Sequence, residues 1–445
     1  MNEPLPAQLP ATPLALPARA SACPGLMRIV EARDGGLCRL KLPGGALTAA
    51  GAQAVAEAAR RFGNGAVEIT NRANLQLRGI AKAQQASLID HLLAAGLGPP
   101  SAAADDVRNL MLSPMAGLDP TAALDTRPLA ASLLQTLEQQ PRFHALSPKF
   151  AIQLDGGEAL AELHHHHDLW LSPLWLAGEL HVALGCASAI AEAPPVAAVP
   201  ASEGMALLLA VLDRFLALAG PAPGRMRELL ASLPAAALLD GLPVASQRGP
   251  FTAVPARMSP PALGLHPQRQ AGEVAVGVAP ALGRMPADSL SALARLALDL
   301  GDGQLRLTPW QGVLIPHVAR GNAGLLQAEA QALGLLLGSH EPLAALVACT
   351  GSAGCGRALA DTKADALHLA GLLGQAIPVH LSGCPRACAQ PRVAPATLLA
   401  VSPGRYDLFL RDASAPGFGR PLGRALTLQE AAAQLAACSW STLND

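Results

Sequence analysis

The sequence of 445 residues lacks several features that would assign a protein to a simple class. Aromatic residues make up only 3% of it, so its cores must be assembled from many small aliphatic contacts. The 32 basic residues nearly balance the 33 acidic ones, and the net charge of −1 favours neither a nucleic-acid partner nor a membrane surface. Any anionic ligand must therefore be met by local basic groups.

Long apolar stretches and targeting signals are also missing. The longest apolar run, Met205–Leu212, ends at Asp213, which is too short for a membrane span and typical of a buried helix. Residues 1–20 are rich in proline and alanine and carry no basic residue before Arg19, the wrong order for a secretory signal. We expect a disordered tail over residues 1–20 of a cytoplasmic protein. No glycine-rich nicotinamide fingerprint is evident either, so electrons must come from a partner.

Eight cysteines are present, and four of them form a group. Disulfides are not the default in a cytoplasmic chain. The spacing is C-x5-C followed by C-x3-C in glycine-rich surroundings, and the four residues are Cys349, Cys355, Cys384 and Cys388. Glycines there would let backbone N–H groups approach sulfide closely, which favours a [4Fe–4S] cluster. Structural zinc, which prefers shorter spacings, a disulfide pair and four unrelated buried thiols are the alternatives.

The chain contains an internal repeat. The segments Val67–Leu77 and Leu305–Ile315 are both rich in strand-forming residues, and Thr70 corresponds to Thr308. Helical patterns precede them at Ala50–Phe62 and Ala287–Leu300, and further helices follow at Gln84–Ala95 and Ala323–Leu337. Matching order and spacing predict a duplicated αβ unit with one ligand site between its halves. In this alignment Arg108 follows Thr70 at about the distance at which Cys349 follows Thr308.

A polar strand face is predicted in the first copy. Residues 72–78 alternate, which would put two guanidinium groups and two amides on one side of a strand. These residues are Arg72, Asn74, Gln76 and Arg78. The strand carries no acidic residue, so this face is a candidate site for carboxylates or phosphates. Trp310, Gly312 and Leu314 replace the first three positions in the second copy, which predicts one active centre rather than two.

Two more basic residues and a histidine run complete the candidates. Arg108 and Lys149 follow in the first copy, and each taken alone is more often a surface charge than a ligand. Histidine occupies four successive positions, 164–167, and at most two of these side chains could face one metal ion in a strand. A solvated turn before a strand over Asp168–Leu171 is the favoured interpretation. His165 and His167 are the pair that could hold a second metal.

These motifs resemble those of the sirohaem-dependent nitrite and sulfite reductase superfamily over nearly the whole chain after residue 21. The resemblance rests on the cysteine pattern, on Thr70–Arg72 with the strand that follows, and on Val107–Asn109. It implies an internally duplicated α+β fold with pseudo-two-fold symmetry. Ferredoxin-like half-domains are expected at residues 21–104 and 243–342. A tetrapyrrole- and anion-binding αβ domain is expected at 105–242, and a cluster-binding αβ domain at 343–445. In that family the last cysteine, here Cys388, bridges the cluster and the sirohaem iron.

Departures from the reductase pattern point to one branch of this superfamily. The reductases hold their anion with two arginines and a Lys-x-Lys pair, and Ala151 stands where the second lysine belongs. Arg386 and Ala387 replace the usual Asn-Gly between the last two cysteines. The chain is also short for a reductase. Further motifs are similar to those of the precorrin-3B synthases, oxygen-dependent ring hydroxylases of aerobic cobalamin biosynthesis. They are Cys23–Gly25, Gly63–Gly65, Ser113–Asp119 and Leu307–Trp310.

The resemblance implies a reaction and a site. Precorrin-3A and O2 would be substrates, and the macrocycle would be hydroxylated at C20 with formation of a lactone. Arg72, Arg108 and Lys149 would be catalytic, and together with Asn74, Gln76 and Arg78 they would grip carboxylates. A [4Fe–4S] cluster would deliver electrons from a donor protein or an NADH-linked reductase, and a mononuclear non-haem iron is a further expectation. The alternatives are a sulfite or nitrite reductase that binds sirohaem and a non-catalytic electron carrier.

Overall fold

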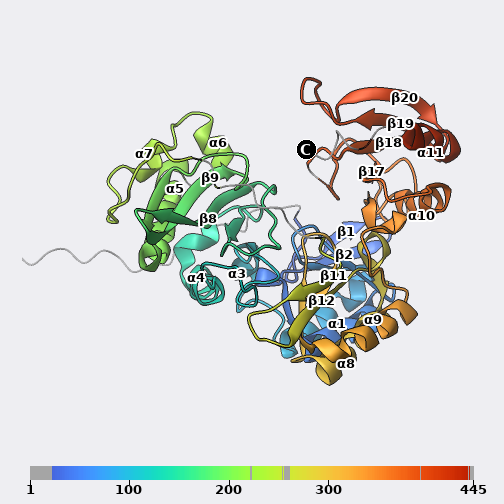
Figure 1. The fold of residues 1–445 in the computed structure, drawn as a ribbon, viewed down its shortest axis with the longest axis horizontal. Coiled ribbons are helices and arrows are strands. Elements are labelled where there is room, and N and C mark those ends of the chain that lie inside the picture. The colour runs from blue at the N-terminus through green and yellow to red at the C-terminus, as the bar shows by residue number, and fades with distance from the viewer. Residues whose placement is uncertain are drawn as a thin grey trace, which may run out of the picture.

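The computed structural model describes residues 23–220, 223–252, 254, 261–390, 392–438 and 440, so the tail expected over residues 1–20 lies outside the described part. The fold is α+β with four five-stranded sheets. Figure 1 shows a central body that contains α1 and α8, flanked by one lobe around β8 and β9 and another around β17–β20. No helix in the described ranges is long and apolar enough to cross a membrane.

The central body contains the same series of elements twice. The first copy comprises β1 (Val30–Ala32), β2 (Gly35–Leu40), β3 (Ala46–Thr48), α1 (Ala49–Phe62), β4 (Ala66–Ile69), β5 (Leu75–Ile80) and α2 (Gln85–Ala94). The second comprises β11 (Gly264–Pro267), β12 (Glu273–Val278), β13 (Arg284–Pro286), α8 (Ala287–Leu300), β14 (Gln304–Leu307), β15 (Val313–Ala319) and α9 (Ala323–Ala332). The predicted duplication is confirmed, and the predicted bounds of α8 are those observed.

The two copies exchange a strand. β13 of the second copy pairs with β4 of the first, and β3 of the first pairs with β14 of the second. Helices α1 and α8 pack against each other, and one apolar core contains side chains of both copies. Since each sheet is completed by the other copy, the two ferredoxin-like units form one body with a shared core.

The two lobes share a sheet topology. In each, three parallel strands are followed by two antiparallel ones, in the orders β6-β7-β8-β9-β10 and β16-β17-β18-β19-β20. The first lobe comprises α3 (Ala102–Asp106), β6 (Leu110–Leu112), α4 (Arg127–Gln139), β7 (Ile152–Leu154), β8 (His167–Leu176), β9 (Glu179–Ser188), β10 (Ala197–Pro200), α5 (Gly204–Ala219), α6 (Met226–Leu230) and α7 (Ala236–Leu239). The second comprises β16 (Leu346–Ala348), α10 (Thr362–Leu372), β17 (Val379–Ser382), β18 (Ala396–Ser402), β19 (Arg405–Leu410), β20 (Arg420–Leu426) and α11 (Leu428–Ala437).

Short 3-10 helices connect these elements. They are η1 (Pro43–Gly45), η2 (Lys82–Gln84), η3 (Pro141–Ala145), η4 (Ala201–Glu203), η5 (Ala281–Gly283), η6 (Arg320–Asn322) and η7 (Pro342–Ala345). The internal repeat extends to them, because η1 and η5 both precede the exchanged strand of their copy and both contain residues with positive φ.

The turn between the last two strands of each half-domain is built by a threonine. Thr70 Oγ1 accepts from Asn74 N at 3.1 Å, and Thr308 Oγ1 accepts from Gly312 N at 3.0 Å. Ala73, with a φ of 53°, bends the first turn. The prediction that residues 72–78 form one continuous strand is therefore wrong at its start: β5 begins at Leu75, and Arg72 and Asn74 belong to the turn. Alternation alone could not reveal this side-chain-stabilised turn.

Candidate functional site

The four grouped cysteines lie in loops that follow parallel strands of the second lobe. Cys349 directly follows β16, and Cys384 lies two residues beyond β17. Gly383 N donates to Cys349 Sγ at 3.3 Å. The pKa of the Cys388 thiol is raised by burial and further by the charges of Cys384, Cys349 and Cys355. The four grouped cysteines lie in the described part of the chain, and no disulfide joins them there.

Glycines shape these loops in different ways. A Cβ on Gly383 would lie 2.6 Å from Ala358 Cβ, and one on Gly351, whose φ is 72°, would lie 2.6 Å from Thr362 N. A Cβ on Gly354 would lie 2.7 Å from Arg78 Nη2. Gly356 has open space around it within the described part. The sequence predicted close approach of glycine N–H groups to a cluster in these loops, and the Gly383 N–H donates to a cysteine sulfur in the described structure.

The cysteine loops dock onto the first ferredoxin-like half-domain. Arg78 donates from Nε and Nη2 to the two carboxylate oxygens of Asp34, both at 2.9 Å, and from Nη2 to Gly354 O at 2.7 Å. Asn71 Nδ2 donates to Ala389 O at 3.2 Å, directly after the last cysteine. The cysteines of one half therefore lie beside the Thr70–Asn74 turn of the other. Arg78 joins the cysteine loop to the half-domain through its hydrogen bonds to Gly354 and Asp34.

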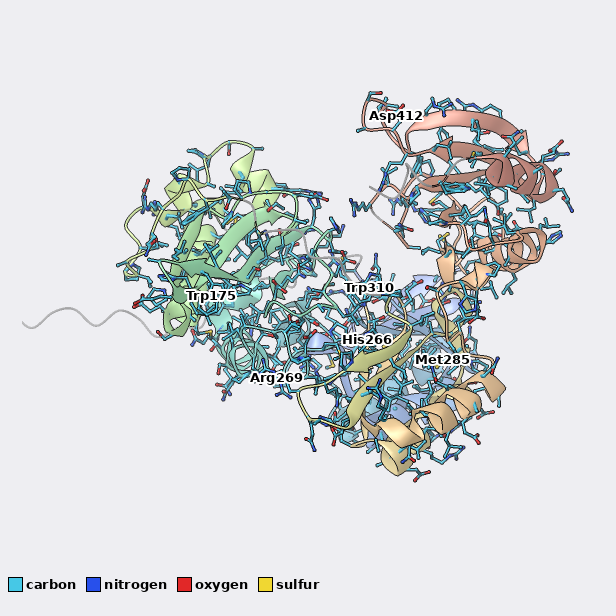
Figure 2. The ribbon with its side chains drawn as sticks, in the orientation of Figure 1. Trp175, His266, Arg269, Met285, Trp310 and Asp412 are labelled. Carbon is cyan, nitrogen blue, oxygen red and sulfur yellow. The ribbon has the colours of Figure 1, made fainter. Side chains whose placement is uncertain are left out.

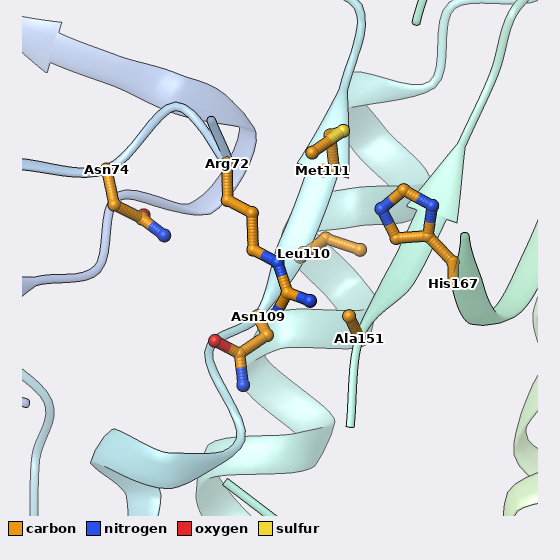
Figure 3. A pocket seen from close by; sticks show the side chains of 7 residues that line it. All are labelled: Arg72, Asn74, Asn109, Leu110, Met111, Ala151 and His167. Atoms are coloured by element: carbon orange, nitrogen blue, oxygen red, sulfur yellow. The ribbon is translucent and has the colours of Figure 1, made fainter. Parts of the chain in front are cut away.

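A small pocket, partly open to solvent, lies where this turn meets the first lobe. Figure 3 shows Arg72 reaching from the turn toward Asn109 and Ala151, with His167 facing it from the other side. The complete lining is Arg72, Asn74, Asn109, Leu110, Met111, Ala151 and His167. Burial, followed by the neighbouring charges of Arg225 and Arg39, lowers the pKa of Arg72 to about 10. Among the described residues, no carboxylate lies within ion-pair distance of Arg72.

Arg39 is a basic residue near this site that the sequence did not single out. It lies opposite Gln76 where β2 pairs with β5, and with the Gln76 amide turned to satisfy both groups, Gln76 Oε1 accepts from Arg39 Nη2 at 2.8 Å. Burial lowers the pKa of Arg39, and the charges of Cys23 and Cys388 oppose that shift. The residue lies more than thirty positions before the polar segment in the chain. Only strand pairing brings the two together.

Arg108 lies away from the position that the repeat suggested, and neither Arg108 nor Lys149 lines the pocket. Arg108 precedes β6 and forms an ion pair with Glu138, and it does not line the pocket. Lys149 is exposed. The alignment of Arg108 with Cys349 is wrong, because Cys349 follows β16 as Ser113 follows β6. Composition and spacing could not fix this register, since both copies carry similar apolar strands.

In the first lobe, Ser113 and Asp119 occupy the positions equivalent to Cys349 and Cys355, and their side chains hold the equivalent loop in place by hydrogen bonds. Ser113 Oγ donates to Leu160 O at 2.7 Å, and Asp119 Oδ2 accepts from Ala159 N at 2.8 Å. Trp310, on the turn equivalent to Arg72, packs against the apolar side chains of this loop, and it lies on the central body in Figure 2. The repeat therefore has one set of cysteine loops, and the equivalent place is filled by protein.

The histidine run is only partly solvated. His164 and His166 are exposed, whereas His167 begins β8 and is buried. The rings of His165 and His167 have centroids 4.8 Å apart, and both Nδ1 atoms contact backbone carbonyls, at 3.1 Å and 2.8 Å. Both Nε2 atoms are buried without a partner among the described residues. Burial is the largest cause that lowers the pKa of His165 to about 4 and that of His167 well below its usual value.

These two rings have a donor pattern suited to a metal ion. Donation from Nδ1 to a carbonyl leaves Nε2 as the unprotonated nitrogen, which is the form that coordinates metals. Within the described ranges, however, no three histidine, cysteine, aspartate or glutamate side chains are placed to hold a metal ion together.

Comparisons with known proteins agree with this architecture. The model described as "Nitrite/Sulfite reductase ferredoxin-like half domain" matches residues 30–95 and 266–333, and the "Nitrite and sulphite reductase 4Fe-4S domain" matches residues 103–239. The solved structure of the Mycobacterium tuberculosis NirA protein has the same fold, with a TM-score of 0.73, 23% identity and coverage of 89% of this chain and 79% of that one.

Curated relatives include ferredoxin–nitrite reductases and a precorrin-3B synthase. The ferredoxin–nitrite reductase of Synechococcus elongatus is 32% identical over 80% of this chain and 75% of its own length. The chloroplastic ferredoxin–nitrite reductase of Arabidopsis thaliana is 32% identical over 80% of this chain, which spans 66% of that protein. A precorrin-3B synthase from a Sinorhizobium species is 29% identical over 89% of this chain and 84% of its own length. The chain belongs to the nitrite and sulfite reductase family.

Proposed function

We propose that this chain is a precorrin-3B synthase that hydroxylates precorrin-3A at C20 with O2 and forms a lactone. The observation that carries this choice over reduction of a small anion is the missing lysine pair at the pocket. Ala151 lines it, Lys149 is exposed, and Arg108 is neutralised by Glu138. His167 lines the pocket with the ring of His165 beside it, and neither adds a charge because burial lowers the pKa of both.

A carboxylate-rich macrocycle fits the groups that remain. Arg72 has no acidic partner in the described part of the chain and lies beside the amides of Asn74 and Asn109. A guanidinium group binds a carboxylate bidentately, and Leu110 and Met111 add an apolar wall against which a tetrapyrrole ring can pack. We include Arg39 with Gln76 as a second carboxylate-binding pair, whereas Arg78, Arg108 and Lys149 would need to rearrange to reach the substrate.

The cysteine loops are the proposed site of the [4Fe–4S] cluster. Four thiols lie on these neighbouring loops, one of them accepts a backbone N–H, and the loops lie next to the basic turn. When bound, the cluster would supply electrons one at a time. The proposed donor is a partner protein or an NADH-linked reductase. A mononuclear iron is proposed at the unpartnered Nε2 atoms of His165 and His167, with further ligands from substrate or solvent.

A ferredoxin-dependent nitrite or sulfite reductase is the second candidate. The identities of 32% to ferredoxin–nitrite reductases, against 29% to the synthase, favour it. The match in length favours the synthase. The chain covers 84% of the length of the synthase, but 66% and 75% of the lengths of these two reductases. A reductase of this type would hold sirohaem next to Cys388.

One set of measurements separates the two candidates. The protein is purified without oxygen, its iron and sulfide are counted, and its absorption spectrum is recorded. Conversion of precorrin-3A is then assayed with a chemical reductant, with and without O2, beside reduction of nitrite and sulfite. The synthase proposal expects a cluster without sirohaem bands and product only with O2. Sirohaem bands together with turnover of nitrite or sulfite would overturn it.

Variants test the proposed residues. Arg72→Ala should weaken binding of precorrin-3A, because it removes the half-buried cation of the pocket, whereas Arg295→Ala on the exposed face of α8 should not. Replacing His165 and His167 by alanine should remove iron beyond the four atoms of the cluster and leave sulfide unchanged. An iron content unchanged by the double substitution would exclude this pair as the second iron site.

A further inference from the structure

Helix α10 begins against the loop that carries the first two cysteines. Thr362 Oγ1 donates to Cys349 O at 2.8 Å and lies 3.3 Å from Cys349 Sγ. Ser352 N donates to Ala360 O at 2.8 Å, which joins the loop to the residues just before the helix. The helix has eleven residues, and its N-terminal end carries partial positive charge. The sulfur of Cys349 therefore lies in an electropositive environment before any side-chain charge is considered.

Lys363, the second residue of α10, adds a full positive charge to this environment. The residue is only 8% exposed. Its Nζ donates to Leu282 O at 2.5 Å, on the central body. Within the part of the chain that the structure describes, no carboxylate lies within ion-pair distance of this ammonium group. Burial lowers the pKa of Lys363, and the charges of Glu68 and Cys349 partly offset that shift.

The neighbouring charges do not supply its counter-ion. Glu68 accepts from Arg284 Nε at 2.8 Å, and Asp34 is bound by Arg78. Each of these carboxylates is thus already matched by an arginine. A buried ammonium group without a paired anion is unfavourable unless another negative charge lies nearby. An iron–sulfur cluster held by four thiolates carries net negative charge and gains one more negative charge on reduction, so it can fill this role.

We propose that Lys363 is the buried counter-charge of the iron–sulfur cluster and raises its reduction potential. The inference rests on the proposed cluster and is independent of which substrate the enzyme takes. A fixed positive charge favours the more negative, reduced state of the cluster, and the low dielectric of the interior strengthens this effect. Lys363 would influence the reaction only through the reduction potential of the cluster, and it would not contact the substrate.

Three substitutions separate charge from packing. Lys363→Met keeps the length and apolar stem of the side chain and removes the charge and the bond to Leu282 O. Lys363→Gln removes the charge and keeps an N–H donor. Lys363→Arg keeps the charge. Lys82→Met is the matched control, because Lys82 is exposed in η2.

The test is a redox titration of the full-length protein purified without oxygen, followed by the electron paramagnetic resonance signal of the reduced cluster. Iron and sulfide are counted first in every sample. We expect Lys363→Met and Lys363→Gln to lower the midpoint potential by at least about 59 mV. For one electron, this shift corresponds to a tenfold change in the equilibrium constant. The Lys363→Arg and Lys82→Met proteins should stay within that margin of the wild type.

Two results would overturn the inference separately. A wild-type protein without cluster iron and sulfide would remove the cluster assignment itself, before any potential is measured. A fully loaded Lys363→Gln protein with the wild-type potential would show that Lys363 only ties α10 to the central body. A shift in Lys363→Arg as large as that in Lys363→Met would likewise assign the effect to packing.

Discussion

Replacing Gly383 by alanine tests whether the backbone next to Cys384 must approach the other cysteine loop. A Cβ at this position would lie 2.6 Å from Ala358 Cβ and 3.2 Å from Ala358 Cα, well inside normal contact. The second atom belongs to the backbone, so the overlap cannot be relieved by rotating a side chain. The loop must move, and the bond from Gly383 N to Cys349 Sγ at 3.3 Å must lengthen.

The expected loss of cluster binding follows from the energetic cost of overpacking at other sites. Inserting a methyl group into a packed region costs about 1–3 kcal/mol. At about 1.4 kcal/mol per tenfold change, this corresponds to a roughly 5- to 150-fold weaker hold on the cluster. The chain supplies a matched control in Gly356, which directly follows Cys355, has ordinary φ and has open space for a Cβ in the described structure.

The assay measures loss of iron to a ferrous chelator under anaerobic conditions, together with the sulfide content at the start. We expect the Gly383→Ala protein to lose its cluster 5- to 150-fold faster than the wild type, and the Gly356→Ala protein to behave like the wild type. Equal rates in the two variants, with full iron and sulfide in both, would refute the argument that this backbone contact supports the cluster.

Three further predictions concern the second lobe and its contact with the central body. Arg78→Met should lower the free energy of unfolding by about 1.5–3 kcal/mol in urea titrations, because the charged hydrogen bonds to Asp34 and Gly354 are lost. Ala387→Gly should raise the melting temperature by an amount equivalent to about 0.5–1 kcal/mol, since Ala387 has a φ of 49°. His380 is buried, and burial lowers its pKa to about 4, so the unfolded chain binds a proton that the folded chain does not. Stability should therefore fall by roughly 2 kcal/mol between pH 7 and pH 5, and His380→Leu should flatten that dependence in urea titrations.

One experimental result would contradict each of these predictions. For Arg78, it is an unfolding curve that matches that of Arg295→Met, a substitution on the exposed face of α8. For Ala387, it is a lower melting temperature in the glycine variant, which would mean that chain entropy outweighs the relief of the left-handed conformation. For His380, it is the same pH slope in the wild type and in the leucine variant.

The sequence by itself determined the duplication and the fold class. Helical periodicity placed α8 at its observed bounds, and a threonine and the strands around it marked the same turn in both copies. These signals are local, because periodicity and turn chemistry act over a few residues. The spacing of the four cysteines is local in the same sense, so the sequence could group them in the two loops that the structure places beside each other.

The tertiary structure decided which groups meet at the site. Strand exchange between the half-domains, and the pairing of Arg39 with Gln76 across β2 and β5, depend on contacts between distant segments. Partner choice also lies beyond local pattern: Arg78 is committed to Asp34 and Gly354, whereas Arg72 reaches the pocket from a turn. The sequence does not show which counter-ion a charged side chain will meet, because packing decides this. The roles of the cations near the cysteine loops could therefore be assigned only from the fold.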